Sequence, residues 1–331
     1  MRVLVTGAAG FTGTFMMQFL SHETGVELTG LVRKPSQRNL LPHACIVADL
    51  LEREHLIPAV NEICPDAIIH LGGLTRGDLG DLLRVNVVGT RNILDAGYRA
   101  NADCRMLVIS SSAVYGYTGA APIAESSPLQ PLSEYGISKV AQEALALLHQ
   151  KQEGAQISIA RPFNLAGPGQ PASFICGKLV QQVTDIGQKK KTALELRETS
   201  SSRDLIDVRD AVRGYWALSS HPEFSERCSG QAFNLGSGNA YPISALIAMI
   251  EEITDRQYDV NLPPATPRAA IPSQRSDNSR MTALTGWKPE ISLPETLRDM
   301  LAAEMQRTSG EKKARGKQTR SNRVHTQNKK M

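Results

Sequence analysis

The sequence predicts an α/β protein with a doubly wound, mostly parallel sheet and a smaller, mixed α/β lobe toward the C-terminus. From Met1 to about Ala160, short apolar runs alternate with helical stretches, which is the pattern of βαβ units. Beyond Arg161, prolines and glycines break the chain into shorter pieces with isolated helices. The chain has 331 residues, more than one hydrophobic core usually holds, so a second lobe is expected.

The predicted strands are short and apolar, as parallel strands buried on both faces usually are. In order they are Arg2–Thr6, Val26–Val32, Ala44–Val47, Asp66–His70, Arg105–Ser110 and Gln156–Ala160. The predicted helices include Leu82–Tyr98 and Ser133–Gln152, the second of them ended by Gly154. A later helix carries one apolar stripe, formed by Ile243, Leu246, Ile247, Ile250 and Ile253. We expect a first domain at residues 1–163, to which some later segments return, a second lobe at 164–307 and a tail at 308–331.

Composition excludes several classes of protein. No run of about 18 apolar residues appears, and Met1 leads directly into a strand without an apolar leader, so neither a membrane span nor a signal peptide is expected. The five cysteines are far apart and lack metal-ligand spacing, which indicates reduced thiols and no metal site. We therefore expect a cytoplasmic protein with no membrane partner.

The basic character of the chain is concentrated in the tail at 308–331. This tail carries a net charge of +7 while the whole chain carries +4, so the preceding residues are slightly acidic. The tail has no hydrophobic periodicity and is predicted to be disordered. A basic arm could contact nucleic acid or an anionic membrane surface, but the absence of interleaved aromatic residues favours a solvated extension without a specific partner.

A glycine-rich turn follows the first predicted strand. The segment Thr6-Gly7-Ala8-Ala9-Gly10-Phe11-Thr12-Gly13 ends a strand and opens a helix, and in this context the spacing predicts dinucleotide binding in a Rossmann-type fold. Gly7 allows a tight turn, Gly10 lets the backbone approach a pyrophosphate, and Gly13 permits close packing of helix on strand. The helix N-terminus offers N–H groups to the phosphates. The alternative is a purely structural strand–helix turn.

The end of the second strand distinguishes the two nicotinamide cofactors. An acidic residue there binds the ribose 2′-hydroxyl, whereas an arginine accommodates a 2′-phosphate. The chain has Arg33 followed by Lys34 and no acid, so NADP(H) is favoured over NAD(H). Further candidate cofactor contacts are Phe11, Thr12, Asp49, Leu50, Leu71 and Gly72. Asp49 is expected to meet the adenine, although an aspartate at this place could instead cap a helix.

Tyr135 and Lys139 form a candidate catalytic pair. They are four residues apart on a predicted helix and therefore share one face. A nearby cation favours the phenolate and is expected to lower the tyrosine pKa, as general acid–base chemistry requires. Ser111 directly follows the fifth strand, at the carboxyl edge where open α/β sheets bind ligands, and could hydrogen-bond a substrate carbonyl.

Together the glycine turn, Ser111, Tyr135 and Lys139 resemble the extended short-chain dehydrogenase/reductase superfamily. The resemblance continues through residues 161–170, 203–210, 234–238 and 284–289. Segments 161–170, 203–210 and 275–279 look most like the GDP-4-keto-6-deoxy-D-mannose reductases. The resemblance implies NADPH-dependent reduction of the C4 ketone of a nucleotide-activated 4-keto-6-deoxy sugar, with GDP-D-rhamnose as the expected product. It also implies a homodimer that pairs the helix of Tyr135 with the preceding long helix.

The resemblance assigns a role to each catalytic residue. Tyr135 would donate a proton to the C4 oxygen, Lys139 would tune Tyr135 and bind the nicotinamide ribose, and Ser111 would orient the carbonyl. Two positions after this serine, the sugar dehydratases carry a glutamate and GDP-fucose synthase carries a cysteine. This chain has Ala113, which cannot transfer a proton, so dehydration and 3,5-epimerisation are disfavoured.

Candidate substrate residues complete the predicted site. Arg203 and Arg275 are expected at the diphosphate, with Asn164 adding amide donors, and Lys178 and Ser112 are further candidates. Arg203 could instead form a surface ion pair with the adjacent Asp204. Two other functions stay open: a C4 epimerase with tightly bound NAD, and a non-catalytic NADPH-binding scaffold. The sequence does not determine the nucleotide base or the C4 configuration of the product.

Overall fold

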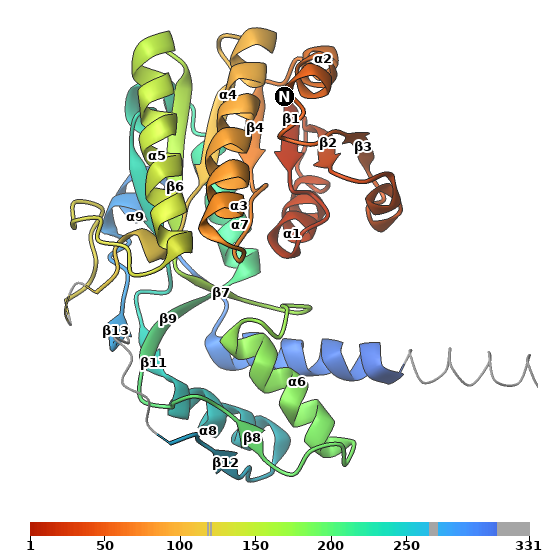
Figure 1. Ribbon diagram of the computed structural model, residues 1–331, viewed down its shortest axis with the longest axis vertical. Coiled ribbons are helices and arrows are strands. Elements are labelled where there is room, and N and C mark those ends of the chain that lie inside the picture. The colour runs from red at the N-terminus through yellow and green to blue at the C-terminus, as the bar shows by residue number, and fades with distance from the viewer. Residues whose placement is uncertain (118, 120, 265–270, 310–331) are drawn as a thin grey trace, which may run out of the picture. The chain divides into compact units, whose positions relative to one another are not determined.

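The computed structural model describes residues 1–117, 119, 121–264 and 271–309, which belong to two compact units (Figure 1). The first unit is built from Met1–Leu165, Ser200–Ile243 and the described part of Pro267–Ser292. The second is built from Ala166–Thr199, Ser244–Thr266 and the described part of Leu293–Met331. Of the predicted tail at 308–331, the first two residues belong to a helical stretch that is described over 293–309, and residues 310–331 lie outside the described residues.

A parallel sheet of seven strands forms the centre of the first unit (Figure 1). Its order is β10-β6-β5-β4-β1-β2-β3, and the order reverses between β1 and β4. The strands are β1 (Arg2–Thr6), β2 (Glu27–Val32), β3 (Ala44–Val47), β4 (Ala67–His70), β5 (Arg105–Ile109), β6 (Gln156–Pro162) and β10 (Ala232–Leu235). This is the doubly wound order of a Rossmann fold, so the predicted fold class is confirmed, and ligands are expected at the carboxyl ends of β1 and β4.

Helices cover both faces of this sheet because successive strand residues point to opposite sides. Val3 and Val5 of β1 pack in one buried cluster with α1 (Phe11–Leu20) and α7 (Val208–Ser219). Leu4 packs in a second cluster on the other face. That cluster draws on α2 (Arg53–Ile63), α4 (Gly89–Ala100) and α5 (Glu134–Glu153). The two apolar layers hold the carboxyl edge of the sheet in place.

The predicted helix Leu82–Tyr98 is part of a longer helical stretch. It consists of α3 (Leu79–Leu83), the π-type turn η2 (Arg84–Val88) and α4. A π turn inserts an extra residue into the helical ladder and often occurs at functional sites. Here the turn contains Asn86, a fully buried polar residue.

The helix α5 agrees with the prediction for Ser133–Gln152. Ser133 is its N-cap and accepts a hydrogen bond from the Gly136 N–H at 3.0 Å. Gly154 ends the helix with φ of +73°, a left-handed conformation that glycine adopts without a steric penalty. Both helix ends are therefore determined by local sequence.

The remaining elements form smaller groups. In the first unit, which holds all of β7 (Asn164–Ala166) except Ala166, β9 (Ser202–Asp207) pairs with β7, β11 (Ala240–Pro242) and β13 (Ser273–Gln274). The helix α9 (Ser279–Thr285) follows β13. The second unit contains α6 (Ile175–Gly187), most of α8 (Ile243–Thr254), and the pair β8 (Leu194–Glu195) and β12 (Val260–Asn261). Leu246 and Ile250 are buried, as the predicted stripe on α8 requires.

Two negative findings apply to the described residues. None of their helices is long and apolar enough to span a membrane. They also contain no group of three or more potential metal ligands, and all five cysteines are free thiols. The predicted cytoplasmic location stays a prediction.

Candidate active site

The turn between β1 and α1 leaves no room for side chains at two of its glycines. Gly7 has φ of +67°, and a Cβ there would lie 2.9 Å from the Gly72 nitrogen. A Cβ at Gly13 would lie 2.1 Å from the Gly7 carbonyl oxygen. The α1 N-cap, Gly10, makes no side-chain capping bond, so the first N–H groups of the helix can donate hydrogen bonds to a ligand. This cradle fits a dinucleotide pyrophosphate.

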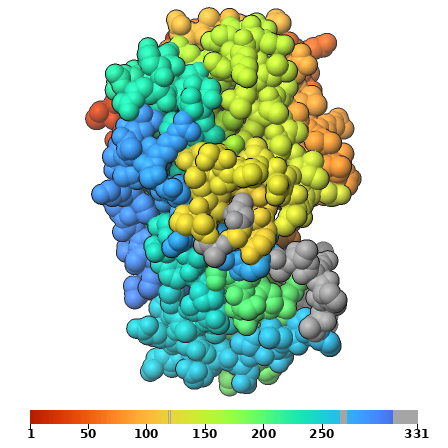
Figure 2. Space-filling view, turned by 90° about the vertical axis from the view of Figure 1, so that its left-hand side faces the viewer, coloured from red at the N-terminus to blue at the C-terminus, as the bar shows by residue number. Residues whose placement is uncertain are grey.

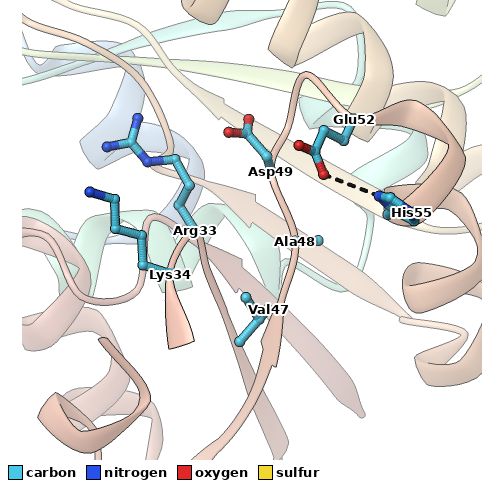
Figure 3. Close-up of a pocket in the computed structure, with 7 residues that line it drawn as sticks. All are labelled: Arg33, Lys34, Val47, Ala48, Asp49, Glu52 and His55. Atoms are coloured by element: carbon cyan, nitrogen blue, oxygen red, sulfur yellow. Dashed lines mark hydrogen bonds and ion pairs between the residues drawn. The ribbon is translucent and has the colours of Figure 1, made fainter. Parts of the chain in front are cut away.

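A cavity of about 430 Å³ lies beside the ends of β2 and β3 (Figure 3). It is lined by Arg33, Lys34, Val47, Ala48, Asp49, Glu52 and His55. Arg33 and Lys34 lie on one side, and the carboxylates of Asp49 and Glu52 lie across from them. Both cations are exposed, and neither forms an ion pair within the described part of the chain. The cavity therefore offers two uncommitted positive charges to a phosphate.

Local hydrogen bonds shape the walls of this cavity. Gln37 Oε1 accepts the backbone N–H groups of Arg33 at 3.1 Å and Lys34 at 2.9 Å, which holds the backbone that carries both cations. Asp49 Oδ1 accepts the Leu51 N–H at 2.9 Å. The N-cap of α2 is Glu52, so Asp49 is not the cap that the alternative interpretation required.

The segment after β4 lies beside the glycine turn. The Gly72 N–H donates to Thr6 Oγ1 at 3.0 Å, and a Cβ on Gly72 would lie 2.9 Å from Leu50 Cδ1. Asn86 holds the backbone two residues farther along, since its side-chain amide exchanges two hydrogen bonds with the backbone of Leu74. The structure thus brings the predicted contacts from β1, β3 and β4 to one edge of the sheet.

Ser111, Tyr135 and Lys139 come together at the same edge. Lys139 Nζ lies 5.9 Å from the centroid of the Tyr135 ring, and Tyr135 shares a side-chain hydrogen bond with Ser111. Ser111 Oγ also accepts the Ala113 N–H at 3.2 Å, which fixes the serine at the start of a short 3-10 helix, η3 (Ser112–Val114). Lys139 Nζ donates to the Ile109 carbonyl at 2.8 Å, which ties α5 to the end of β5.

Burial sets the proton affinities of this group. It raises the pKa of Tyr135 to about 12, although the hydrogen bond with Ser111 acts in the opposite direction. It lowers the pKa of Lys139 to about 8, against the opposing charge of Glu143. The expectation of a lowered Tyr135 pKa is therefore wrong, because the cost of burying the phenolate raises the pKa above its usual value. Tyr135 is protonated at neutral pH, which suits a proton donor.

Three candidate substrate residues lie on, or directly after, strands that pair with one another. Arg203 of β9 is in register with Gln274, the last residue of β13, and Arg275 directly follows Gln274. Asn164 of β7 donates from Nδ2 to the Asp204 carbonyl at 3.0 Å. Arg203 Nη1 donates to two backbone carbonyls, those of Ser202 and Ile271, both at 2.9 Å.

The Asp204 carboxylate connects these strands. It is fully buried and accepts hydrogen bonds from Ser237 N and Oγ, from Gly238 N, and from Ser276 N and Oγ, at 2.6 to 3.1 Å. Ser276 directly follows Arg275, so one buried charge holds the backbone beside both arginines.

Two candidate residues lie apart from this group. Ser112 is only 5% exposed, whereas Ser111 is half-buried, so Ser111 is the more accessible hydroxyl. Lys178 lies on α6 in the second unit, and its contact with a substrate stays a prediction.

Sequence reasoning missed several polar residues around the site. Gln37 supports the cation pair from three residues beyond Lys34, a local spacing that could have suggested it. Gln142 accepts from Lys139 one helical turn later, which helical periodicity could also have suggested. Thr90 and His70 join Gln142 from other elements, and no local signal indicates that contact.

A Rossmann sheet with a glycine turn at its switch point and a Ser–Tyr–Lys group at its carboxyl edge defines a nicotinamide-dependent oxidoreductase of the short-chain type. The model of the GDP-mannose 4,6 dehydratase family matches residues 4–300, and the chain belongs to this family.

Relatives and solved structures are similar over most of the chain. GDP-6-deoxy-D-mannose reductase of Pseudomonas aeruginosa is 34% identical over 310 residues, covering 91% of this chain and 96% of the relative. GDP-6-deoxy-D-talose 4-dehydrogenase of Aggregatibacter actinomycetemcomitans is 27% identical, covering 78% and 82%. The structure of RMD from Pseudomonas aeruginosa complexed with NADPH matches with a TM-score of 0.81 and 33% identity, covering 92% and 99%.

Proposed function

We propose that this protein is an NADPH-dependent 4-ketoreductase that converts GDP-4-keto-6-deoxy-D-mannose to GDP-D-rhamnose. The observation that carries the proposal is the grouping of Ser111, Tyr135 and Lys139 with Ala113 at the position two residues after the serine. The similarity to GDP-6-deoxy-D-mannose reductase supports the same reaction.

The residues present fit an NADP(H) cofactor. Gly7, Gly10 and Gly13 would hold the pyrophosphate, and Arg33 with Lys34 would bind a 2′-phosphate. The similar structure complexed with NADPH supports this choice. When bound, the reduced nicotinamide supplies the hydride for the C4 carbon of the sugar.

Each catalytic side chain then has one task. Ser111 Oγ hydrogen-bonds the C4 oxygen and orients the carbonyl, and Tyr135 Oη donates its proton to that oxygen as negative charge develops. Lys139 contributes a buried positive charge close to Tyr135, which stabilises the phenolate that proton donation leaves behind.

Ala113 separates this activity from dehydration and epimerisation. Loss of a sugar hydroxyl or inversion at C3 and C5 needs a further proton-transfer group near the sugar. Ala113 offers only a methyl group there, and its backbone N–H is already bonded to Ser111. Net reduction of the ketone needs no such group, so it is the reaction that these residues can complete.

We further propose that Asn164, Arg203 and Arg275 bind the nucleotide diphosphate. One arginine on β9 and one directly after the neighbouring β13 can chelate two phosphates, and the buried Asp204 carboxylate fixes the backbone beside them. Lys178, on α6 of the second unit, stays a further candidate for substrate binding.

A turnover experiment tests the proposed function. Purified protein is mixed with NADPH and enzymatically generated GDP-4-keto-6-deoxy-D-mannose, the 340 nm absorbance of NADPH is followed, and the sugar is identified by NMR. The proposal predicts one NADP⁺ per sugar reduced and the C4 configuration of D-rhamnose. Interconversion of C4 epimers without net oxidation of NADPH would indicate an epimerase. NADPH binding without turnover of GDP-, UDP-, dTDP- or CDP-linked keto sugars would indicate a scaffold.

We also propose a homodimer that pairs α5 with α4. Ile137 and Leu148 on α5 and Val88 before α4 are 44%, 49% and 48% exposed, although large aliphatic residues are usually buried. Figure 2 shows α5, in yellow-green, at the surface of the first unit. Light scattering should give twice the chain mass, and Ile137→Asp should shift it toward the monomer. A monomeric wild-type protein would exclude the proposed dimer.

A further inference from the structure

A chain of buried polar side chains connects Lys139 with the end of β1. Lys139 Nζ donates to Gln142 Oε1, and Gln142 Nε2 donates to Thr90 Oγ1, both at 2.7 Å. Thr90 Oγ1 lies 3.0 Å from His70 Nε2, and His70 Nδ1 lies 2.7 Å from Thr6 Oγ1. All five residues are at most 6% exposed. Every group in this chain therefore depends on its neighbour, because water is not available to replace it.

The direction of each hydrogen bond follows from the donors available. A lysine ammonium has no acceptor, so Gln142 must present Oε1 to it and Nε2 to Thr90. The Thr90 hydroxyl donates its single proton to the Asn86 carbonyl at 2.6 Å, so His70 must donate from Nε2. His70 Nδ1 then accepts the proton of the Thr6 hydroxyl. Only this assignment of donors and acceptors satisfies every hydrogen bond from Lys139 to Thr6.

At its far end, this series of hydrogen bonds reaches the glycine turn between β1 and α1. Burial lowers the pKa of His70 to about 3, and the charge of Lys139 acts in the same direction, so the ring is neutral as this arrangement requires. Thr6 Oγ1, which donates to His70, accepts the Gly72 N–H at 3.0 Å. Gly72 is also the residue that a side chain on Gly7 would strike. The lysine and the glycine turn are thus joined through buried groups.

We propose that Gln142 is a positioning residue that aims the Lys139 ammonium at the reacting end of the cofactor. Two of the three ammonium N–H groups are committed, to Gln142 and to the Ile109 carbonyl. Because the groups around nitrogen are tetrahedral, these two bonds fix the direction of the third. The inference rests on the proposed function only through the role of Lys139, and does not depend on the identity of the sugar.

Two substitutions separate positioning from stability. Gln142→Met keeps the length of the side chain but offers no strong acceptor to Lys139. Gln142→Glu keeps an acceptor for Lys139 but cannot donate to Thr90. Ser158→Ala is the matched control, since it removes another buried hydrogen bond, to the Gln231 carbonyl at 3.3 Å, on β6.

The full-length variants are compared in three measurements: the unfolding midpoint, the NADPH dissociation constant without sugar, and kcat and KM with the keto sugar. We expect Gln142→Met to lower kcat about tenfold and to weaken NADPH binding several-fold, with the KM of the sugar unchanged. Gln142→Glu should recover most of kcat although its midpoint is lowered like that of the methionine variant. Ser158→Ala should lower only the midpoint.

Two results would overturn the inference. The first is that the Gln142→Met variant has the same kcat and the same NADPH affinity as the wild-type protein. The other is an equal loss of activity in both Gln142 variants that follows their loss of stability. If the wild-type protein binds NADPH but does not reduce the sugar, the proposed function fails, and the NADPH affinity of Gln142→Met alone then decides the inference.

Discussion

The two ends of the proposed cofactor site are built in opposite ways. At the adenosine end, Arg33 and Lys34 are exposed beside an open cavity, and a nearby residue, Gln37, holds their backbone. At the nicotinamide end, Lys139 is 6% exposed and is held by groups from β5, α5, α4 and, through His70, β4. Cofactor preference can therefore change at little cost to the fold, whereas the catalytic end tolerates little change.

The largest effect is expected from Tyr135→Phe at the buried end. Loss of the hydroxyl removes the proton donor and its hydrogen bond with Ser111 but keeps the ring, so kcat should fall about 1,000-fold. NADPH affinity, measured by fluorescence, should change less than about threefold if the variant keeps its fold. A variant with near-wild-type kcat would show that another group donates the proton.

Substitutions at the exposed end should change only the affinity for the cofactor. Arg33→Ser combined with Lys34→Ser removes both cations of the cavity, and the KM of NADPH should rise about tenfold to a hundredfold. The KM of NADH and the unfolding midpoint should stay nearly unchanged, and Arg99→Ser serves as the control for loss of an exposed charge. An equal rise for both cofactors would mean that these residues do not bind a 2′-phosphate.

Substitution of Asp204 tests whether the buried polar groups near the predicted diphosphate site tolerate as little change as those at the catalytic end. Asp204→Asn weakens several charge-assisted hydrogen bonds to Ser237, Gly238 and Ser276. The free energy of unfolding should fall by about 2–3 kcal/mol in urea titration. Asp103→Asn, in an exposed turn, should change it by less than about 0.5 kcal/mol. A similar small change for Asp204→Asn would argue that this carboxylate does not organise the strands.

The smallest effect is expected from pH. The pKa of Lys139 is lowered from 10.5 to about 8, so its charge is lost as the pH rises through about 8, and kcat should decline up to about tenfold by pH 9. The unfolded chain binds more protons than the folded one between about pH 8 and 10.5, so this lysine makes stability rise with pH there. A pH-independent kcat up to pH 10 would contradict a need for charged Lys139.

The sheet was largely predictable because buried parallel strands are continuous apolar runs. The bounds of β1 and β3 agree with the prediction to the residue, and β2, β4 and β5 differ by one residue at an end. The seventh strand, β10, was not predicted as a strand. It pairs with β6 from about 70 residues farther along the chain, and such a long-range pairing leaves no local pattern.

The candidate site was likewise predictable only where local sequence determines it. Helical spacing placed Tyr135 and Lys139 on one face, and the glycine spacing placed the cofactor turn. The raised pKa of Tyr135 depends on burial by distant elements, which helical spacing does not reveal. The chain from Lys139 through Thr90 also depends on the π-type turn at Arg84–Val88, whose Asn86 carbonyl accepts the Thr90 proton.

Isotope transfer tests the central claim most directly. NADPH carrying deuterium at the transferable C4 position is incubated with protein and GDP-4-keto-6-deoxy-D-mannose, and the product is analysed by mass spectrometry and NMR. The account predicts one deuterium at C4 of the sugar for each NADPH oxidised. Product without deuterium, or C4 epimers formed without net oxidation of NADPH, would contradict it.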